Sequence, residues 1–385
     1  MKNPSGLFCL IFMYVVLNLS GASFANAASK YGPTSAIGHE VEAAIKNVLA
    51  CKNGGIPSES ALRTLFEYMS VNDGSSFRSQ PAKRNAEGMG IFWRFTFNKP
   101  FTQTLRYLYN PNIAPEILYP SSIRRGGWLP GSDIITLAPP LWKRAENVEG
   151  QLAIRGKEFE EITPDTFSGS YYSYTLDRLL LLQKCRDVPV LFSVGWQDGE
   201  SSEGKKGWFL GDYADWDFVF TDASGGTDSS IGWMSTYMYA SCTITLFFPV
   251  GVNGENTGCA MFKWLKAGWS GINAVNRSHI SSGASRSFEG LLGVIEDSHI
   301  SGPETLEAIT ASVRALDRAQ LLERTAAYSL ELSRASRDEE ILGRSEFQKM
   351  LEGGKYNERI SEAQLRSMLA VNELKKVMGK KVLSE

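Results

Sequence analysis

The sequence predicts an α+β protein, in which a largely antiparallel sheet is flanked by helices and followed by a charged helical C-terminal extension. Three observations lead to this class. Segments rich in aromatic and β-branched residues recur between residues 91 and 250. Apolar residues at helical spacing precede and follow these segments. The composition also changes near residue 300: all nine tryptophans lie before that point, whereas residues 303–385 hold 14 acidic, 14 basic and only three aromatic residues.

The N-terminal segment, residues 1–27, has the pattern of a secretory signal peptide. It carries one charge, Lys2, then an apolar run over residues 7–19, then Ala25 and Ala27 in the A-x-A arrangement that precedes cleavage. The apolar run holds 13 residues, fewer than the ~20 that a membrane-spanning helix needs. We therefore predict cleavage before Ala28, a soluble mature chain with no integral membrane segment, and a secreted or periplasmic location.

Two helices are predicted next, over residues 37–49 and 58–69, because apolar residues recur there every three or four positions. The sheet follows as seven strand-like segments: IFWRFTF (91–97), IITLA (134–138), QLAIRG (151–156), VLFSVG (190–195), GWFLG (207–211), DFVFT (217–221) and ASCTITLFFPV (240–250). The run NTGCAMFKWLKAGWSGINAV, residues 256–275, places apolar residues and glycines on one helical side. It is predicted to leave the sheet as a helix, and residues 287–295 are predicted to form another.

The C-terminal region is predicted to consist of two helical stretches. Ser301 and Glu304 form a capping-box pattern before a long amphipathic helix that extends to residue 334. Ser361 and Gln364 form a second capping box, and Gly379 marks the end of the helix that follows. The domain organisation is therefore an aromatic-rich α+β domain over residues 28–300 and a charged helical region over residues 301–385, which the change of composition suggests is separable.

The stretch GESSEGKK, residues 199–206, resembles a phosphate-binding loop. Such a loop needs a Ser or Thr hydroxyl after its lysine and a helix beyond it. Here Lys206 stands at the hydroxyl position and a strand-like segment follows. We therefore predict a β-hairpin connection and no nucleotide cofactor.

Charge offers little evidence of a polyanionic partner. The chain holds 40 basic and 42 acidic residues, with a formal net charge of −2. No basic cluster is denser than pairs such as Lys375 and Lys376. Nucleic-acid binding usually requires a basic stripe, so no nucleic-acid partner is expected.

Four cysteines follow the predicted signal peptide, namely Cys51, Cys185, Cys242 and Cys259. An even number in an exported chain allows two disulfides, with three possible connectivities. The alternative is that all four are buried free thiols, since a chain this long does not need covalent cross-links to be stable.

Asp215 and Asp217 are candidate catalytic carboxylates. If the segment GDYADWDFVFTD is a strand, both point to one face about 6.6 Å apart, with Trp216 on the other face. Such a separation suits an inverting glycosidase. The alternative is that these acids protect an exposed sheet edge from mispairing.

The histidines form a second candidate cluster. His279 and His299 lie in repeated SHIS segments, each predicted to follow a helix, and histidine is suited to proton transfer near neutral pH. The alternative is that both simply face solvent. No metal site is predicted, because His39 in HEVEA lacks the second histidine of a metalloprotease helix. The sequence also lacks a C-x-x-C pair and a G-x-S-x-G elbow.

Trp208, Trp216 and Trp233 are candidate binding residues, because exposed aromatic rings bind glycans or partner proteins. Core packing is the alternative for each. The function that follows is an exported, non-catalytic module that binds a glycan or a protein. Two alternatives are an envelope glycan hydrolase that uses the carboxylate pair, and a structural protein that assembles through its C-terminal helices.

Overall fold

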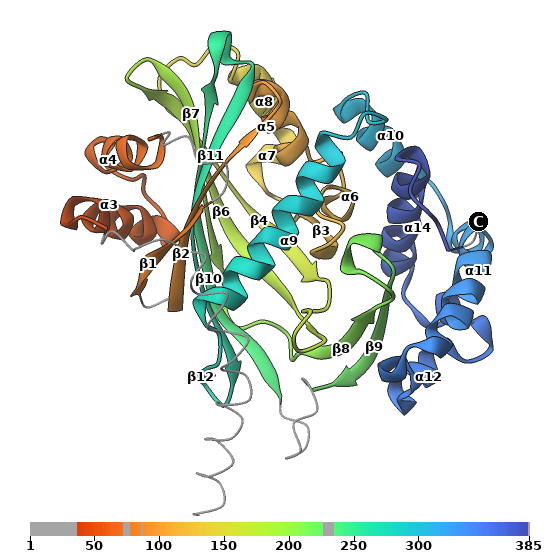
Figure 1. Cartoon of the computed structure of the whole chain (residues 1–385). Helices are drawn as coiled ribbons and strands as arrows, with labels where there is room; N and C mark the ends of the chain where they lie inside the picture. The colour runs from red at the N-terminus through yellow and green to blue at the C-terminus, as the bar shows by residue number, and fades with distance from the viewer. Residues whose placement is uncertain (1–36, 72–77, 86–87, 226–234, 384–385) are drawn as a thin grey trace, which may run out of the picture.

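The computed structural model describes residues 37–71, 78–85, 88–225 and 235–383 (Figure 1). The predicted signal peptide and Trp233 lie outside these ranges. The described residues form a large antiparallel sheet, a small three-stranded sheet and helices that cover both faces of the large one. The predicted α+β class, with its C-terminal helices, is therefore confirmed. None of the described helices combines the length and the apolar surface that crossing a membrane requires.

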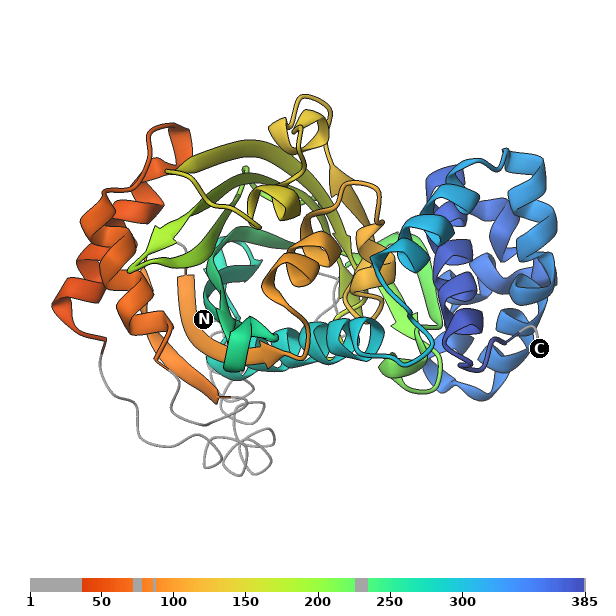
Figure 2. The ribbon, with the colours of Figure 1, turned by 90° about the horizontal axis from the view of Figure 1, so that it is seen from above.

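The large sheet has the strand order β1-β2-β11-β10-β7-β6-β4-β3, and β12 pairs with β11 beyond this path. Its strands are β1 (Arg78–Asn85), β2 (Gly88–Phe97), β3 (Ile123–Trp128), β4 (Leu152–Ile162), β6 (Ser173–Cys185), β7 (Val188–Gln197), β10 (Thr236–Val250), β11 (Asn256–Trp269) and β12 (Ile272–Asn273). All the pairings are antiparallel. The sheet curves, so it has a concave face and an outer face (Figure 2).

The predicted helix over residues 256–275 is wrong, because most of it is strand β11. This strand pairs with β10 along its whole length and with β2 on its other side. A central strand covered on both faces is apolar on both, so the alternation typical of a half-buried strand is lost. Gly258 of this strand leaves room for the Phe248 ring of β10, since a Cβ at position 258 would lie 2.6 Å from that ring.

One further strand assignment fails, and several strands of the large sheet have no prediction. Residues 134–138 were predicted as a strand, but α7 (Asp133–Thr136) is a single helical turn whose Asp133 carboxylate accepts a hydrogen bond from the backbone N–H of Arg155. Conversely, strands β1, β3 and β6 of the large sheet have no prediction. In β6 the run LDRLLLL does not alternate between apolar and polar residues, because leucines lie on both faces of the strand, so the strand is not recognised from sequence.

The helices predicted over residues 37–49 and 58–69 are confirmed as α3 (His39–Leu49) and α4 (Glu59–Met69), and they cover the outer face of the sheet. Their buried side chains, including Val48, Leu62 and Leu65, join one apolar cluster with strand residues such as Phe192 and Phe262. Ser58 caps α4 by accepting a hydrogen bond from the N–H of Ala61. The outer face is thus an ordinary apolar core.

The concave face is crossed by the long helix α9 (Arg277–Ile295) (Figure 1). The predicted helix over residues 287–295 is its C-terminal half. Ile280 and Ala284 of α9 pack on Ile91, Trp93 and Met261 of the sheet. Shorter helices fill one end of the concave side: α5 (Phe101–Tyr109), α6 (Pro115–Leu118), α7 and α8 (Leu141–Arg144).

The small sheet has the order β5-β8-β9, with β5 (Ser170–Tyr171), β8 (Lys205–Phe209) and β9 (Phe218–Ser224). The GESSEGKK stretch leads from β7 in the large sheet to β8 in the small one. The predicted β-hairpin is therefore wrong, because these two strands do not pair. The lysines of the stretch make ion pairs, Lys205 with Asp222 at 3.1 Å and Lys206 with Glu346 at 2.7 Å.

The C-terminal region is helical, as predicted, but its first helix is divided. It contains α10 (Pro303–Arg314), α11 (Arg318–Ala335), α12 (Ser345–Leu351), α13 (Tyr356–Arg359) and α14 (Glu362–Val377), with 3-10 turns Ser336–Asp338, Glu340–Gly343 and Glu352–Gly354. The break occurs at Asp317, which caps α11 together with Gln320. The predicted capping box at Ser301 is wrong, because that hydroxyl pairs with Thr305 instead.

The second predicted capping box is confirmed: Ser361 and Gln364 cap α14 reciprocally. Gly379 follows this helix with φ of 65°, the left-handed conformation that ends many helices.

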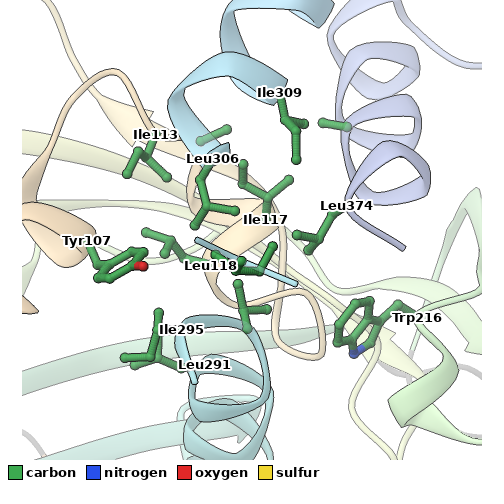
Figure 3. Packing of buried hydrophobic residues seen from close by; sticks show 14 of the residues in the cluster. Tyr107, Ile113, Ile117, Leu118, Trp216, Leu291, Ile295, Leu306, Ile309 and Leu374 are labelled. Carbon is green, nitrogen blue, oxygen red and sulfur yellow. The ribbon is translucent and has the colours of Figure 1, made fainter. Parts of the chain in front are cut away.

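The C-terminal helices share an apolar core with the sheet region. Leu306 and Ile309 of α10 and Leu374 of α14 lie beside Ile117 and Leu118 of α6 (Figure 3). This cluster continues without interruption under the concave face. Whether residues 28–300 fold alone stays a prediction, and the shared core argues against it.

Candidate functional site

The structure does not place Asp215 and Asp217 on one strand face. Asp215 ends a 3-10 turn (Tyr213–Asp215), is exposed, and accepts a hydrogen bond from the N–H of Asp212 at 3.0 Å. Asp217 is 5 % exposed and binds the ammonium of Lys375, with its two oxygens 2.9 and 3.0 Å from Nζ. The predicted geometry of a facing carboxylate pair is therefore wrong, because a turn replaces the strand between the two acids.

Asp217 belongs to a buried polar group at the C-terminal helices. Tyr328 of α11 also donates its hydroxyl to Asp217, at 3.1 Å. Burial raises the pKa of Asp217, and the Lys375 ammonium opposes this shift only in part. The group joins residues 158 positions apart in the sequence, so it connects α11 and α14 to the segment that leads into β9.

Trp216 is buried, at 6 % exposed. Its indole N–H donates to the hydroxyl of Ser121 at 2.9 Å, and the Lys380 ammonium lies 4.4 Å from its ring centroid. Its backbone is left-handed, with φ of 63°, a strained conformation for a bulky residue that the buried ring compensates. Trp208 is half-buried and stacks on Phe209. Trp216 thus presents no exposed stacking surface.

His279 and His299 are not brought together. His279 lies in the first turn of α9, not after a helix, and its ring centroid is 5.0 Å from that of Phe167. His299 follows the other end of α9 and contacts Asp297 through Nδ1 at 3.0 Å. The helix between them is about 28 Å long. The two histidines therefore cannot share one site with each other.

The four cysteines form no disulfide: Cys51, Cys185, Cys242 and Cys259 are all free and buried. The disulfide alternative is therefore wrong, and the alternative of buried thiols holds. Three of the cysteines lie in the outer-face cluster, whereas Cys259 lies in the cluster under the concave face. Burial raises the pKa of Cys259 well above its usual value, so this thiol is unreactive.

A different group of polar side chains lies on the concave face, in the middle of the large sheet. We call it the concave belt, and it consists of Glu158 and Glu160 of β4, Tyr174 and Arg178 of β6, Ser193 of β7, Thr243 and Thr245 of β10, and Lys263 of β11. Cross-strand pairs place its members on one face, since directly opposed residues point to the same side. Arg178 is opposite Gly195, which is opposite Thr243, which is opposite Lys263.

The belt is held by two charge-assisted contacts. The Arg178 guanidinium donates to Glu158 Oε2 through Nε at 3.0 Å and also through Nη2. The Tyr174 hydroxyl donates to Glu160 Oε2 at 2.7 Å. Gly195 makes room for the guanidinium, because a Cβ there would lie 2.6 Å from Nη1 of Arg178. These contacts fix the orientation of the planar polar groups before any ligand arrives.

Lys263 is the member without a counterpart. It is half-buried, and the described residues contain no hydrogen-bond or ion-pair partner for its ammonium. Burial lowers the pKa of Lys263, and nearby Glu160 opposes this shift. Burial also raises the pKa of Glu160, and Glu158 adds to the shift. Polar groups with shifted pKa values that converge on a concave surface are typical of a ligand site.

The sequence carries a weak signal for the belt. Glu158 and Glu160 alternate within β4, and Arg178 and Lys263 each interrupt an otherwise apolar strand. Charged residues seldom lie within interior strands unless they are paired or functional. The signal could not be interpreted because β6 and β11 were not recognised as strands.

The described residues contain no group of three or more His, Cys, Asp or Glu side chains arranged to hold a metal ion. No protein-family model matches the chain, and no curated protein is detectably similar to it in sequence.

Proposed function

We propose that this protein is an exported, non-catalytic binding protein that holds a hydroxyl-rich ligand of the glycan class against its concave belt. The observation that carries the proposal is a half-buried row of oriented charged and hydroxyl groups at the centre of the concave face. Carboxylates and a guanidinium bind sugar hydroxyls through charge-assisted hydrogen bonds, and tyrosine rings pack on sugar faces. The export part is supported by the signal-peptide pattern of residues 1–27.

The Lys263 ammonium narrows the ligand class. A desolvated cation without a partner is costly unless a ligand group satisfies it. An acidic sugar, with a carboxylate among its hydroxyls, supplies such a group. The two alternatives of the sequence have less support, because the carboxylates of Asp215 and Asp217 already have structural partners and the C-terminal helices pack into the core.

A glycan array with the purified protein, followed by calorimetric titration of its best ligands, tests the proposal. Lys263→Ala should weaken binding at least tenfold with little change in the melting temperature. Lys266→Ala is the matched control, since this lysine of the same strand contacts Tyr239 instead, and it should bind normally. Failure of every glycan to bind, or normal binding by Lys263→Ala, would refute the proposal. Release of reducing sugar from a bound ligand would favour the hydrolase alternative.

N-terminal sequencing of the exported protein tests the location. We expect the mature chain to begin at Ala28. Retention of residues 7–19 would contradict export by a cleaved signal.

A further inference from the structure

A second candidate site lies at the junction of the sheet region with the C-terminal helices, away from the concave belt. A cavity of about 230 Å³ opens between α6 and β3 on one side and α10 and α14 on the other. Its lining is strongly basic, because Arg125 of β3, Arg314 of α10 and Arg366 of α14 all border it. Glu116 of α6 is the one acidic residue in this lining.

The three guanidinium groups retain donors for a ligand. Arg125 donates to Glu161 through Nε and Nη2, at 3.1 and 3.3 Å. Arg366 donates through Nη2 to the carbonyl oxygen of Leu316 at 2.9 Å and pairs with Glu362. Arg314 is exposed and has no hydrogen-bond or ion-pair partner among the described residues. A guanidinium has five N–H donors, so each of these groups keeps some free.

Glu116 provides the second, independent indication of a ligand. It is 8 % exposed, and its Oε1 accepts a hydrogen bond from the hydroxyl of Ser367 at 2.9 Å. Its Oε2 is buried and has no hydrogen-bond partner among the described residues. A buried polar atom without a partner is costly, which indicates a group that the described side chains do not supply. Burial raises the pKa of Glu116, so this carboxyl group takes up a proton at a higher pH than an exposed glutamate does.

We propose that this cavity binds a small oxyanion with several oxygen acceptors, such as a phosphate or dicarboxylate group, between Arg125, Arg314 and Arg366 and beside the buried Glu116. Guanidinium groups match such anions through paired N–H donors. The residues come from both sides of the junction, so the anion links the C-terminal helices to the sheet region. This site is independent of the glycan proposal, since the two share no residue.

Calorimetric titration with inorganic phosphate and with malonate, at constant ionic strength, tests the site. We expect saturable binding of at least one of the two anions, accompanied by a rise in melting temperature. Phosphate binding alone would identify a phosphate site, and malonate binding alone a carboxylate site. Binding of neither at millimolar concentration would refute the proposal.

Variants locate the binding. Arg314→Gln should weaken it at least fivefold without loss of fold, because the side chain is exposed and unpaired. Arg337→Gln is the matched control: Arg337 is an exposed arginine in the same helical region that does not border the cavity, and its replacement should have no effect. Glu116→Gln should bind at least as well as wild type, because the amide removes a negative charge beside the anion and supplies N–H donors. Equal binding by Arg314→Gln and Arg337→Gln, or loss of binding in Glu116→Gln, would overturn the assignment.

Discussion

Two sets of helices pack against the sheet region in different ways. The N-terminal cover, α3 and α4, packs on the outer face through apolar side chains, and Arg94 of β2 donates to the carbonyl oxygens of Tyr68 and Met69. The C-terminal cover, α10 to α14, combines apolar packing with buried ionisable groups and two cavities. We therefore expect the first arrangement to contribute stability alone, and the second to make stability depend on pH as well.

The same contrast separates the two faces of the sheet. The outer face buries a continuous apolar cluster from β2 to β6, whereas the concave face carries charged groups at its centre. Burying a charged group costs free energy unless it is paired. Leucines at the centre of the concave face would stabilise the fold more than these charged side chains do. The presence of the charged side chains there is consistent with a function beyond stability.

Deletion of the C-terminal cover should have the largest effect. Truncation after Gly302 exposes Ile117 and Leu118 and removes the partner of Asp217. We expect loss of cooperative unfolding and aggregation, measured by circular-dichroism melts and gel filtration. A soluble truncated protein with one sharp transition would show that residues 301–385 are the separable unit that the composition suggested.

Removal of the buried cation should have the next largest effect. Lys375→Ala leaves Asp217 buried without its counter-ion and should cost about 3–5 kcal/mol of unfolding free energy in denaturant titrations. Lys376→Ala is the control, because that neighbour is 42 % exposed, and should change stability by less than about 0.5 kcal/mol. Equal effects of the two substitutions would show that the Asp217 pair does not hold the C-terminal cover.

An apolar truncation in the N-terminal cover should cost slightly less. Leu62 is fully buried, so Leu62→Ala should lower the unfolding free energy by about 3 kcal/mol. The loss should not depend on pH, since the cluster around Leu62 is apolar. Arg63→Ala on the exposed side of the same helix is the control and should be nearly neutral. A pH-dependent loss in Leu62→Ala would remove the distinction between the two covers.

A smaller effect should appear as a pH dependence of the C-terminal cover. Glu116 faces Ser367 and Arg366 of α14, Arg125 of β3 and Arg314 of α10. The pKa of Glu116 is raised in the folded state. Its contribution to the stability of the folded state is therefore complete below the unfolded pKa and is lost as pH rises through the folded pKa.

Wild type should therefore lose stability relative to Glu116→Gln as pH rises, by about 1.4 kcal/mol for each unit of the shift. Denaturant titrations of both proteins over the same pH range measure this difference. Parallel stability profiles would show that Glu116 titrates normally.

The smallest effect is expected at Asp215. This carboxylate is exposed and only closes a 3-10 turn, so Asp215→Asn should change the free energy of unfolding by less than about 0.5 kcal/mol. Asp217→Asn, two residues away, should cost clearly more because it leaves Lys375 buried without a counter-charge. Similar losses in both variants would restore the view that the two acids act as a pair.

Much of the fold follows from local sequence patterns. Residues close together in the chain determine several elements: helices α3, α4 and α14, the cap at Ser361, and the strands around VLFSVG and DFVFT. Caps and alternation depend on neighbours a few positions away, so the sequence alone was sufficient for them.

Tertiary structure decided the rest. Strands β6 and β11 are buried on both faces, so they lack the alternation that marks a strand, and only their pairing identifies them. The concave belt, the partner of Asp217 and the arginine cavity all join residues from distant segments. Such sites depend on the register of strands and the packing of helices, which local spacing does not encode. The sequence by itself therefore determined the class of the fold and several of its helices and caps. Long-range packing determined where its charged groups meet.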